Sequence, residues 1–224
     1  MTRRYTVLVL ILILVGATLI PTSVSAGGTL SIDLQFRGGK LDTSHIYLNL
    51  VYGSAREYFG AAPYQSCAGY YSRPTELVAA LYLSSVTGQP PRTILKNKKG
   101  RGWGRLAKDM GLPSNYWAKG HGRGKKARVE YVDDARFESE LYLRYLSSYY
   151  GADRRQMEFW LQRGLDETDL LIGLNLAART GRPAATIMSL RTNGLSWAVI
   201  AVRFGQNPAV LTRPAPPRTR AARR

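Results

Sequence analysis

The lysines and arginines between residues 92 and 128 are the side chains of this sequence most able to do chemistry. They alternate with glycines and with Trp103, Tyr116 and Trp117. Basic side chains neutralise the phosphates or sulfates of an anionic polymer and release its counterions, and aromatic rings stack on bases or sugars. The stretch therefore predicts an anion-binding surface, although a solvated surface without a ligand has the same composition. The candidate residues are Arg92, Lys96, Lys98, Lys99, Arg101, Arg105, Lys108, Lys119, Arg123, Lys125, Lys126 and Arg128.

Groups suited to catalysis or metal binding are sparse by comparison. The two histidines, His45 and His121, have no second histidine or cysteine at a spacing that would hold a metal ion. Four carboxylates cluster ahead of an expected helix, where they favour its N-terminus through the helix dipole. They are Asp133, Asp134, Glu138 and Glu140. We therefore expect no catalytic residues, no metal and no cofactor. A cell-wall hydrolase that uses these carboxylates is a less favoured alternative.

The first 26 residues have the three parts of a secretory signal peptide. Arg3 and Arg4 give a positive start, an apolar run extends from Val7 to Ile20, and Val24-Ser25-Ala26 offers a cleavage site. The apolar run is shorter than the ~20 residues that a membrane-spanning helix needs. We expect export to the periplasm or the extracellular space, with a retained membrane anchor as the alternative.

Two stretches of the sequence repeat each other at a constant offset of 93 residues. Residues 75–95 read TELVAALYLSSVTGQPPRTIL, and residues 168–188 read TDLLIGLNLAARTGRPAATIM. After a one-residue slip, GRGWGRLAKDMG at 100–111 aligns with GLSWAVIAVRFG at 194–205. So many identities in one register indicate an internal duplication. We therefore expect two copies of one module.

Each copy predicts a set of short helices. In the second copy, Asp166 with Asp169 has the spacing of a helix N-terminus, and Gly181 suits a C-terminal cap. Pro183 suits the first turn of the next helix. Short helices of this kind cannot bury their apolar stripes alone, so they should pack as compact three-helix units. The expected core residues are Leu81, Ile94, Trp103, Leu106, Leu174, Ile187, Trp197, Ile200 and Phe204.

The expected fold is mainly α, with two copies of a short-helix, helix-turn-helix-like bundle module and a short β-like segment after the signal peptide. Apolar residues alternate from Leu30 to Phe36 and from Ile46 to Leu50, which is typical of strands. Ser54 with Glu57 has the spacing of a capping box. The expected organisation is a signal peptide at 1–26, a β-like segment at 27–53, module copy 1 at 54–113, a basic glycine-rich linker at 114–129, module copy 2 at 130–207 and a disordered basic tail at 208–224.

The stretch GLSWAVIAVRFG at 194–205 resembles the helix-turn-helix of sigma-factor and LuxR-type DNA-binding domains. The resemblance implies that this stretch forms the scanning helix of such a motif, with DNA as the partner. A recognition helix follows in those families, whereas here Gly205 is followed by a proline-rich segment. The duplicated module also resembles uncharacterised exported bacterial proteins, a resemblance that implies no activity.

The formal net charge of +17 and the scarcity of catalytic groups favour binding over catalysis. We expect an exported binding or structural protein without enzymatic activity, whose basic segments contact an anionic envelope polymer, lipid head groups or nucleic acid. A protein–protein interaction module of the cell envelope is the main alternative, and Val199 with Val202 would be its exposed residues. DNA binding through the helix-turn-helix is less favoured.

Overall fold

The computed structural model describes residues 36–37, 40–117 and 131–217. This part of the chain is mainly helical, which confirms the predicted fold class at that level. The predicted signal peptide lies outside the described residues. None of the helices in the described ranges has the length and apolar composition of a membrane span.

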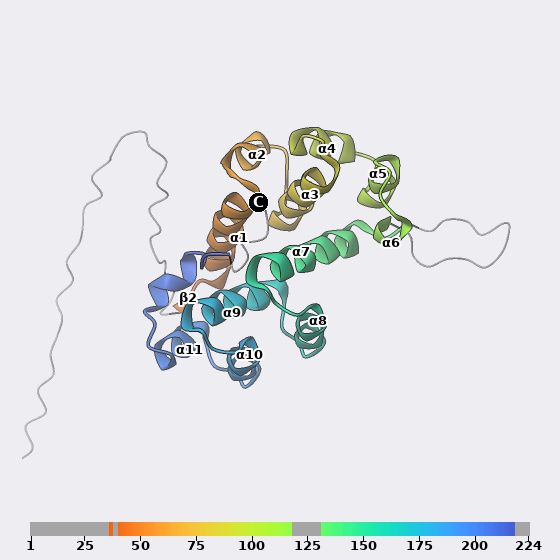
Figure 1. Ribbon diagram of the computed structural model, residues 1–224. Helices are drawn as coiled ribbons and strands as arrows, with labels where there is room; N and C mark the ends of the chain where they lie inside the picture. Colours follow the sequence, from red (N-terminus) through yellow and green to blue (C-terminus); the bar gives the residue numbers. More distant parts are fainter. Residues whose placement is uncertain (1–35, 38–39, 118–130, 218–224) are drawn as a thin grey trace, which may run out of the picture. The chain divides into compact units, whose positions relative to one another are not determined.

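Within residues 40–117 and within residues 131–217, the helices follow one another with short connections (Figure 1). Before them, the two-residue strands β1 (Phe36–Arg37) and β2 (Lys40–Leu41) pair antiparallel. The first half of the chain forms α1 (Thr43–Phe59), α2 (Ala61–Ser66), α3 (Pro74–Thr87), α4 (Pro91–Lys98), α5 (Trp103–Asp109) and α6 (Ser114–Trp117). The second half forms α7 (Asp134–Tyr150), α8 (Arg154–Gln162), α9 (Glu167–Thr180), α10 (Ala184–Thr192), α11 (Trp197–Arg203) and the 3-10 helix η1 (Pro208–Thr212).

Three helices of the first half have a counterpart of equal length in the second half. Helices α1 and α7 have 17 residues each, α3 and α9 have 14 each, and α5 and α11 have 7 each. Gly88 ends α3 and Gly181 ends α9, both in the left-handed region with φ of 72° and 67°. Glycine is favoured there because it has no Cβ to strain that conformation. Helices of 17, 14 and 7 residues thus recur in the same order in both halves of the described chain.

The predicted strand from Ile46 to Leu50 is wrong, because these residues lie in α1. Both ends of that run are buried, and their four-residue separation also places them on one helical face. Ser54 does not begin a helix either. Its hydroxyl lies inside α1 and donates to the carbonyl of Leu50 at 2.5 Å. The N-cap is Asp42, whose carboxylate accepts from the Ser44 N–H at 3.0 Å. The predicted module boundary at residue 54 therefore falls inside a helix.

Two apolar clusters form the core, and helices from both halves of the chain contribute to each. Helix α1 packs on α9 as well as on α3, and α7 packs on α3 as well as on α9. Ile46 and Leu50 of α1 lie in the cluster built mainly from α7 to α11. Phe137 and Leu141 of α7 lie in the cluster built mainly from α3 to α5. The N-terminal part of α1 therefore packs in the second-half cluster, and the N-terminal part of α7 packs in the first-half cluster.

The residues expected in the core lie in these two clusters. Eight of them are at most 5% exposed, and Phe204 is half-buried against the second-half cluster. Trp103 is 0% exposed and Trp197 is 1% exposed. The eight are Leu81, Ile94, Trp103, Leu106, Leu174, Ile187, Trp197 and Ile200.

The predicted disordered tail at 208–224 is wrong for its described part, residues 208–217. Leu211 and Ala215 are buried against the helices. The segment is held through its backbone by Asn175, which is 0% exposed in α9. The side-chain amide of Asn175 donates to the carbonyl of Arg213 at 3.1 Å and accepts from the Ala215 N–H at 2.6 Å. Prolines prevent this backbone from pairing regularly with another segment. The buried side chain of Asn175 therefore provides hydrogen bonds to its N–H and carbonyl groups. Residues 218–224 lie outside the described ranges.

Replacing Asn175 with alanine is expected to lower the free energy of unfolding by about 1–3 kcal/mol, because it leaves the buried Ala215 N–H without an acceptor, whereas the Arg213 carbonyl keeps the hydrogen bond from Arg179 at 2.6 Å. Hydrogen exchange of the amides between Leu211 and Ala215 should accelerate at the same time. Urea unfolding and exchange mass spectrometry measure the two effects. Asn193→Ala, at an exposed helix end, is the control and should cost less than about 0.5 kcal/mol. Unchanged protection in Asn175→Ala would show that this side chain does not hold the segment.

Candidate functional site

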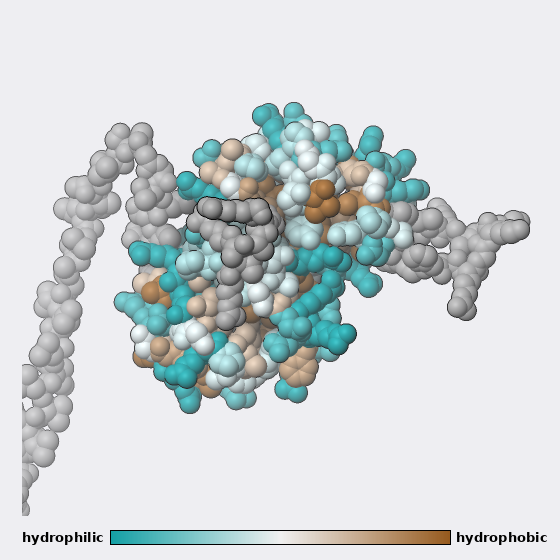
Figure 2. All heavy atoms as spheres, in the orientation of Figure 1, coloured by the Kyte–Doolittle hydropathy of each residue, from teal (hydrophilic) through white to brown (hydrophobic). Residues whose placement is uncertain are grey.

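Seven of the twelve predicted anion-binding residues lie in the described ranges, on α4, on α5 and in the loop between them. In Figure 2, hydrophilic side chains lie at the top of the molecule and along its right edge in this region, with pale and apolar side chains between them. Lys98 is half-buried, and the other six are exposed. They are Arg92, Lys96, Lys99, Arg101, Arg105 and Lys108. We call these six residues the basic surface. The remaining five candidates, Lys119, Arg123, Lys125, Lys126 and Arg128, lie outside the described residues, and of the predicted linker only Ser114–Trp117 is described, as α6.

The basic surface follows from the amphipathic pattern of α4. Ile94 and Leu95 are buried on one side of the helix. Arg92, Lys96 and Lys99 follow a spacing of four and then three residues, which places them on a common face that points away from the core. Prolines at 90 and 91 begin the helix. Gly100 follows its C-cap with φ of 82°, and Gly102 is the N-cap of α5 with φ of 76°. The loop that presents Arg101 is therefore short and glycine-bounded.

A pocket of about 670 Å³ opens beside this surface. Its wall comes from the segment after α2, from the end of α4 and from the loop to α5. Lys96, Lys99 and Arg101 lie at its exposed edge together with Tyr70, and the half-buried Tyr71 lines it further in. The pocket thus combines cations with aromatic rings, as the sequence predicted for the basic stretch, but the two tyrosines come from outside that stretch.

Two carboxylates in the pocket, from Glu76 and Asp134, are paired with Lys98. The Lys98 ammonium lies 3.0 Å from Glu76 Oε1 and 3.6 Å from Asp134 Oδ2. Burial alone would raise the pKa of Glu76. The hydrogen bond from the Ser72 N–H at 2.7 Å and the Lys98 ammonium outweigh it and hold this pKa below its usual value. Lys98 is thus occupied within the protein, so the cations available to a ligand are those at the edge.

Tyr70 forms a platform under two cations of the basic surface. The Arg92 guanidinium lies 4.6 Å from the centre of its ring, and the Lys96 ammonium lies 5.5 Å from it. Arg92 also donates to the Tyr70 hydroxyl. The ring itself is 37% exposed. An exposed ring with cations above it suits stacking on a sugar or a base whose neighbouring group is anionic.

The predicted acidic cluster holds helices together. Asp133 caps α7 by accepting from the Arg136 N–H at 2.9 Å, and Asp134 accepts from the Trp103 N–H at 2.7 Å. Glu138 is only 2% exposed. Its oxygens accept from Arg73, Thr75 and the Trp103 indole, each at 2.8 Å. Glu140 pairs with Arg144 at 2.7 Å and also with Arg154. These partners bind α7 to α3, α5 and α8.

The remaining candidate residues of the sequence analysis are not brought together into a site within the described ranges. His45 lies in α1, and His121 lies outside the described residues. Among the residues that the structure describes, no three His, Cys, Asp or Glu side chains come together as a metal site. Val199 and Val202 of α11 are 53% and 62% exposed. After α11 the chain turns at Gly205 and enters η1.

Sequence reasoning missed Tyr70, Glu76 and Asp134 as parts of the pocket. Glu76 and Lys98 are 22 residues apart, too far for a helical pairing pattern. The internal repeat contained a sign of this contact, because at the offset of 93 the positions that match Glu76 and Lys98 are Asp169 and Arg191. An acid and a base in both copies would have suggested a contact.

Comparison with known proteins finds no matching family model, no similar curated protein and no similar solved structure.

Proposed function

We propose that this is an exported, non-enzymatic protein that binds an anionic polymer through the basic surface of α4 and α5. The observation that carries the proposal is a set of six exposed cations beside a pocket of about 670 Å³. Lys98 lies between the carboxylates of Glu76 and Asp134 and neutralises one of them, so the group leaves one negative charge against the six cations. Arg101 has an acidic neighbour in Asp109 at 3.7 Å, but both side chains are exposed and such pairs contribute little.

We also propose that residues 43–113 and 134–207 are two copies of one module. Matching helix lengths and glycine caps support this, as does a repeated group of an acid, a base and a tryptophan. The group consists of Glu76, Lys98 and Trp103 in the first copy, and of Asp169, Arg191 and Trp197 in the second. The acid–base distance is 3.0 Å in one and 2.9 Å in the other, and the cation lies 5.4 Å and 5.5 Å from the indole.

The positive charge is concentrated in the first of the two proposed copies. Residues 91–109 carry seven lysines or arginines and one aspartate, whereas residues 184–203 carry two arginines and no acid. Val199 stands where α5 has Arg105, and Val202 stands where α5 has Lys108. Because the shared helices do not require these cations, we attribute them to ligand binding.

The test is the salt dependence of heparin and DNA binding by the full chain and by a charge-reversal variant, Lys96→Glu/Lys99→Glu/Arg101→Glu. Each contact with the polymer contributes about 0.7–0.9 to the slope of log affinity against log salt, so losing three contacts should lower the slope by about 2–3. Affinity at low salt should fall more than about tenfold. Fluorescence anisotropy over a salt series measures both.

The matched control is Arg155→Glu/Arg163→Glu/Arg203→Glu, which changes the net charge equally on α8, α11 and the turn after α8. It should keep most of the affinity. Equal losses in the two variants would mean that net charge alone attracts the polymer and would remove the assignment to α4 and α5. Binding that salt does not weaken would also contradict the proposal.

Protein–protein interaction is the second candidate, favoured by the exposure of Val199 and Val202 at 53% and 62%. Two neighbouring exposed valines on one short helix form an apolar spot that a partner could cover. A partner retained from cells at high salt, and lost in Val202→Lys, would favour this function over polymer binding.

A further inference from the structure

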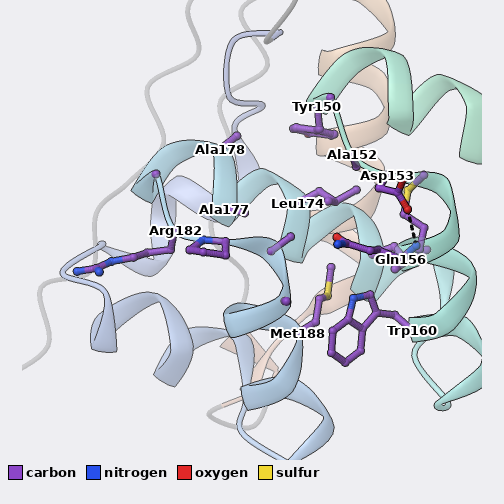
Figure 3. Close-up of a pocket in the computed structure, with 17 residues that line it drawn as sticks. Tyr150, Ala152, Asp153, Gln156, Trp160, Leu174, Ala177, Ala178, Arg182 and Met188 are labelled. Carbon is purple, nitrogen blue, oxygen red and sulfur yellow. Dashed lines mark hydrogen bonds between the residues drawn. The ribbon is translucent and has the colours of Figure 1, made fainter.

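A second pocket, of about 440 Å³, lies in the other half of the chain among the end of α7, α8, α9 and α10 (Figure 3). Its size is within the range of about 300–1,000 Å³ that small-molecule sites have. The floor is apolar and each of its side chains is at most 8% exposed. They are Met157, Trp160, Leu170, Leu174 and Met188. In Figure 3, Trp160 and Met188 approach the space from below and Leu174 from the opposite side.

The space continues along α8. An adjoining hollow of about 290 Å³ is lined by Arg155, Gln156, Phe159, Trp160 and Ala185. Gln156, Trp160 and Ala185 line both spaces. Phe159, which is 43% exposed, extends the apolar lining to the surface. Because the two hollows share these three residues, we treat them as one elongated, partly apolar channel between α8 and α10, a shape that fits a chain-shaped ligand better than a compact one.

The channel exists because α8 is placed differently from its counterpart in the first half. There α2 packs against α4, whereas α8 packs mainly against α7 and α9. Small side chains from Ala177, Ala178 and Ala185 keep the gap open. At the offset of 93 the first half has Ser84, Ser85 and Arg92 in these places.

One end of the channel attracts a negative charge. Pro183, Ala184 and Ala185 line the pocket at the start of α10, and no side chain caps this helix. The first N–H groups of a helix lack internal partners and carry the positive end of its dipole. Arg182 lies at the same end and extends outward from the rim (Figure 3). Asp153 on the opposite wall is occupied in capping α8, where it accepts from the Gln156 N–H at 3.0 Å.

Tyr150 provides a polar group in the lining. It is 3% exposed, and its hydroxyl has no hydrogen-bond partner among the described residues. Burial raises the pKa of this hydroxyl, so it keeps its proton and can donate. A buried donor without an acceptor costs free energy, and the charges that act on this hydroxyl are those of Arg179 and Glu57, outside the pocket lining.

We infer that the channel between α8 and α10 binds a single-chain amphiphile with an anionic head group, such as a fatty acid or an alkyl phosphate. The alkyl chain lies over Met157, Trp160 and Met188. The head group lies at the start of α10 near Arg182. The inference is independent of the polymer site on α4 and α5.

The experiment titrates the full chain with dodecanoate, dodecyl phosphate and the neutral dodecyl maltoside, each below its micelle concentration, by calorimetry. We expect saturable binding of one or both anionic compounds, and the stronger one identifies the head group. Dodecyl maltoside should bind at least about tenfold more weakly. Stronger binding of the maltoside, or no saturable binding of any compound, would overturn the inference.

Pocket-filling variants locate the site. Ala178→Phe and Ala185→Phe should each weaken binding about tenfold or more, because the added ring occupies the channel. Ala185 is exposed, so its variant should fold even if Ala178→Phe does not. Ser85→Phe, at the position of the first half that matches Ala178, is the control and should bind as the unmodified chain does. Arg182→Glu should weaken only the anionic compounds. Equal effects of Ser85→Phe and Ala185→Phe would overturn the assignment.

Discussion

Raising the pH above about 10 is expected to unfold this protein in one cooperative step that ionises several tyrosines together. Four tyrosines of α7 are at most 3% exposed, and burial raises the pKa of each. They are Tyr142, Tyr145, Tyr149 and Tyr150. In the folded state they stay protonated above pH 10, whereas in the unfolded chain they ionise near pH 10. Alkaline pH therefore stabilises the unfolded chain.

The effect is large because the four contributions add. A pKa raised in the folded state leaves stability unaffected below the unfolded pKa and reduces it as the pH rises above that value. Each tyrosine then costs about 1.4 kcal/mol per pH unit above about 10, and four cost about 6 kcal/mol per unit. The whole stability of a domain is about 5–15 kcal/mol. We expect the midpoint of unfolding between about pH 10 and 12.

Tyrosinate absorbance and far-ultraviolet circular dichroism measure ionisation and unfolding in the same samples. The two curves should coincide. Tyr150→Phe removes one ionisable group whose hydroxyl has no partner in the described structure. It should leave stability at neutral pH within about 1 kcal/mol and move the alkaline midpoint upward. Gradual ionisation of all tyrosines without loss of helix would contradict the prediction.

Replacing Trp103 or Trp197 with alanine is expected to lower the free energy of unfolding by about 3–5 kcal/mol in each case. Both indoles are buried, at 0% and 1% exposure. Trp103 stacks on Phe137 with ring centres 5.7 Å apart and planes 9° from parallel. Removing either indole leaves a cavity that surrounding helices cannot close. Urea unfolding followed by circular dichroism gives the values, and Phe159→Ala, at a side chain 43% exposed, is the control.

The phenylalanine variants separate packing from hydrogen bonding. Trp103→Phe removes the indole donor to Glu138, and Trp197→Phe removes the indole donor to Asp169, both bonds of 2.8 Å. Glu138 is the more deeply buried carboxylate, with its side chain 3% exposed against 13% for Asp169. Trp103→Phe should therefore cost more, by about 1 kcal/mol. A cost for Trp103→Ala no larger than that for Phe159→Ala would refute the anchoring role of this residue.

The fold could be predicted from the sequence where local pattern and repeat agree. The helices from Pro74 onward follow from caps, glycines and apolar stripes, which act over a few residues. The start of α1 could not be predicted in the same way, because Ile46 and Leu50 fit both a strand and a helix over so short a run. The order of the C-terminal segment depends on Asn175, and no local signal marks that contact.

The candidate site also has some features that the sequence predicts and others that depend on tertiary packing. The exposure of Lys96 and Lys99 follows from the face of α4, which sequence spacing determines. The position of Tyr70 beneath Arg92 depends on how α2 returns against α4, and this is tertiary packing. The channel between α8 and α10 is likewise a matter of helix placement. The alanines along it are common in any helix, so composition alone does not mark it.

Helices α1 and α7 each contribute residues to the apolar cluster of the other half of the chain, and this constrains how the chain folds during synthesis. When α3 to α5 leave the ribosome, the helix that covers them has not yet emerged. Their apolar surface stays open until residues beyond Phe137 and Leu141 arrive, so the first half cannot mature ahead of the second. Contacts so distant in sequence form slowly, and an uncovered apolar surface invites aggregation in the meantime. A chain of this design gains from a chaperone that holds it until its C-terminal half is complete.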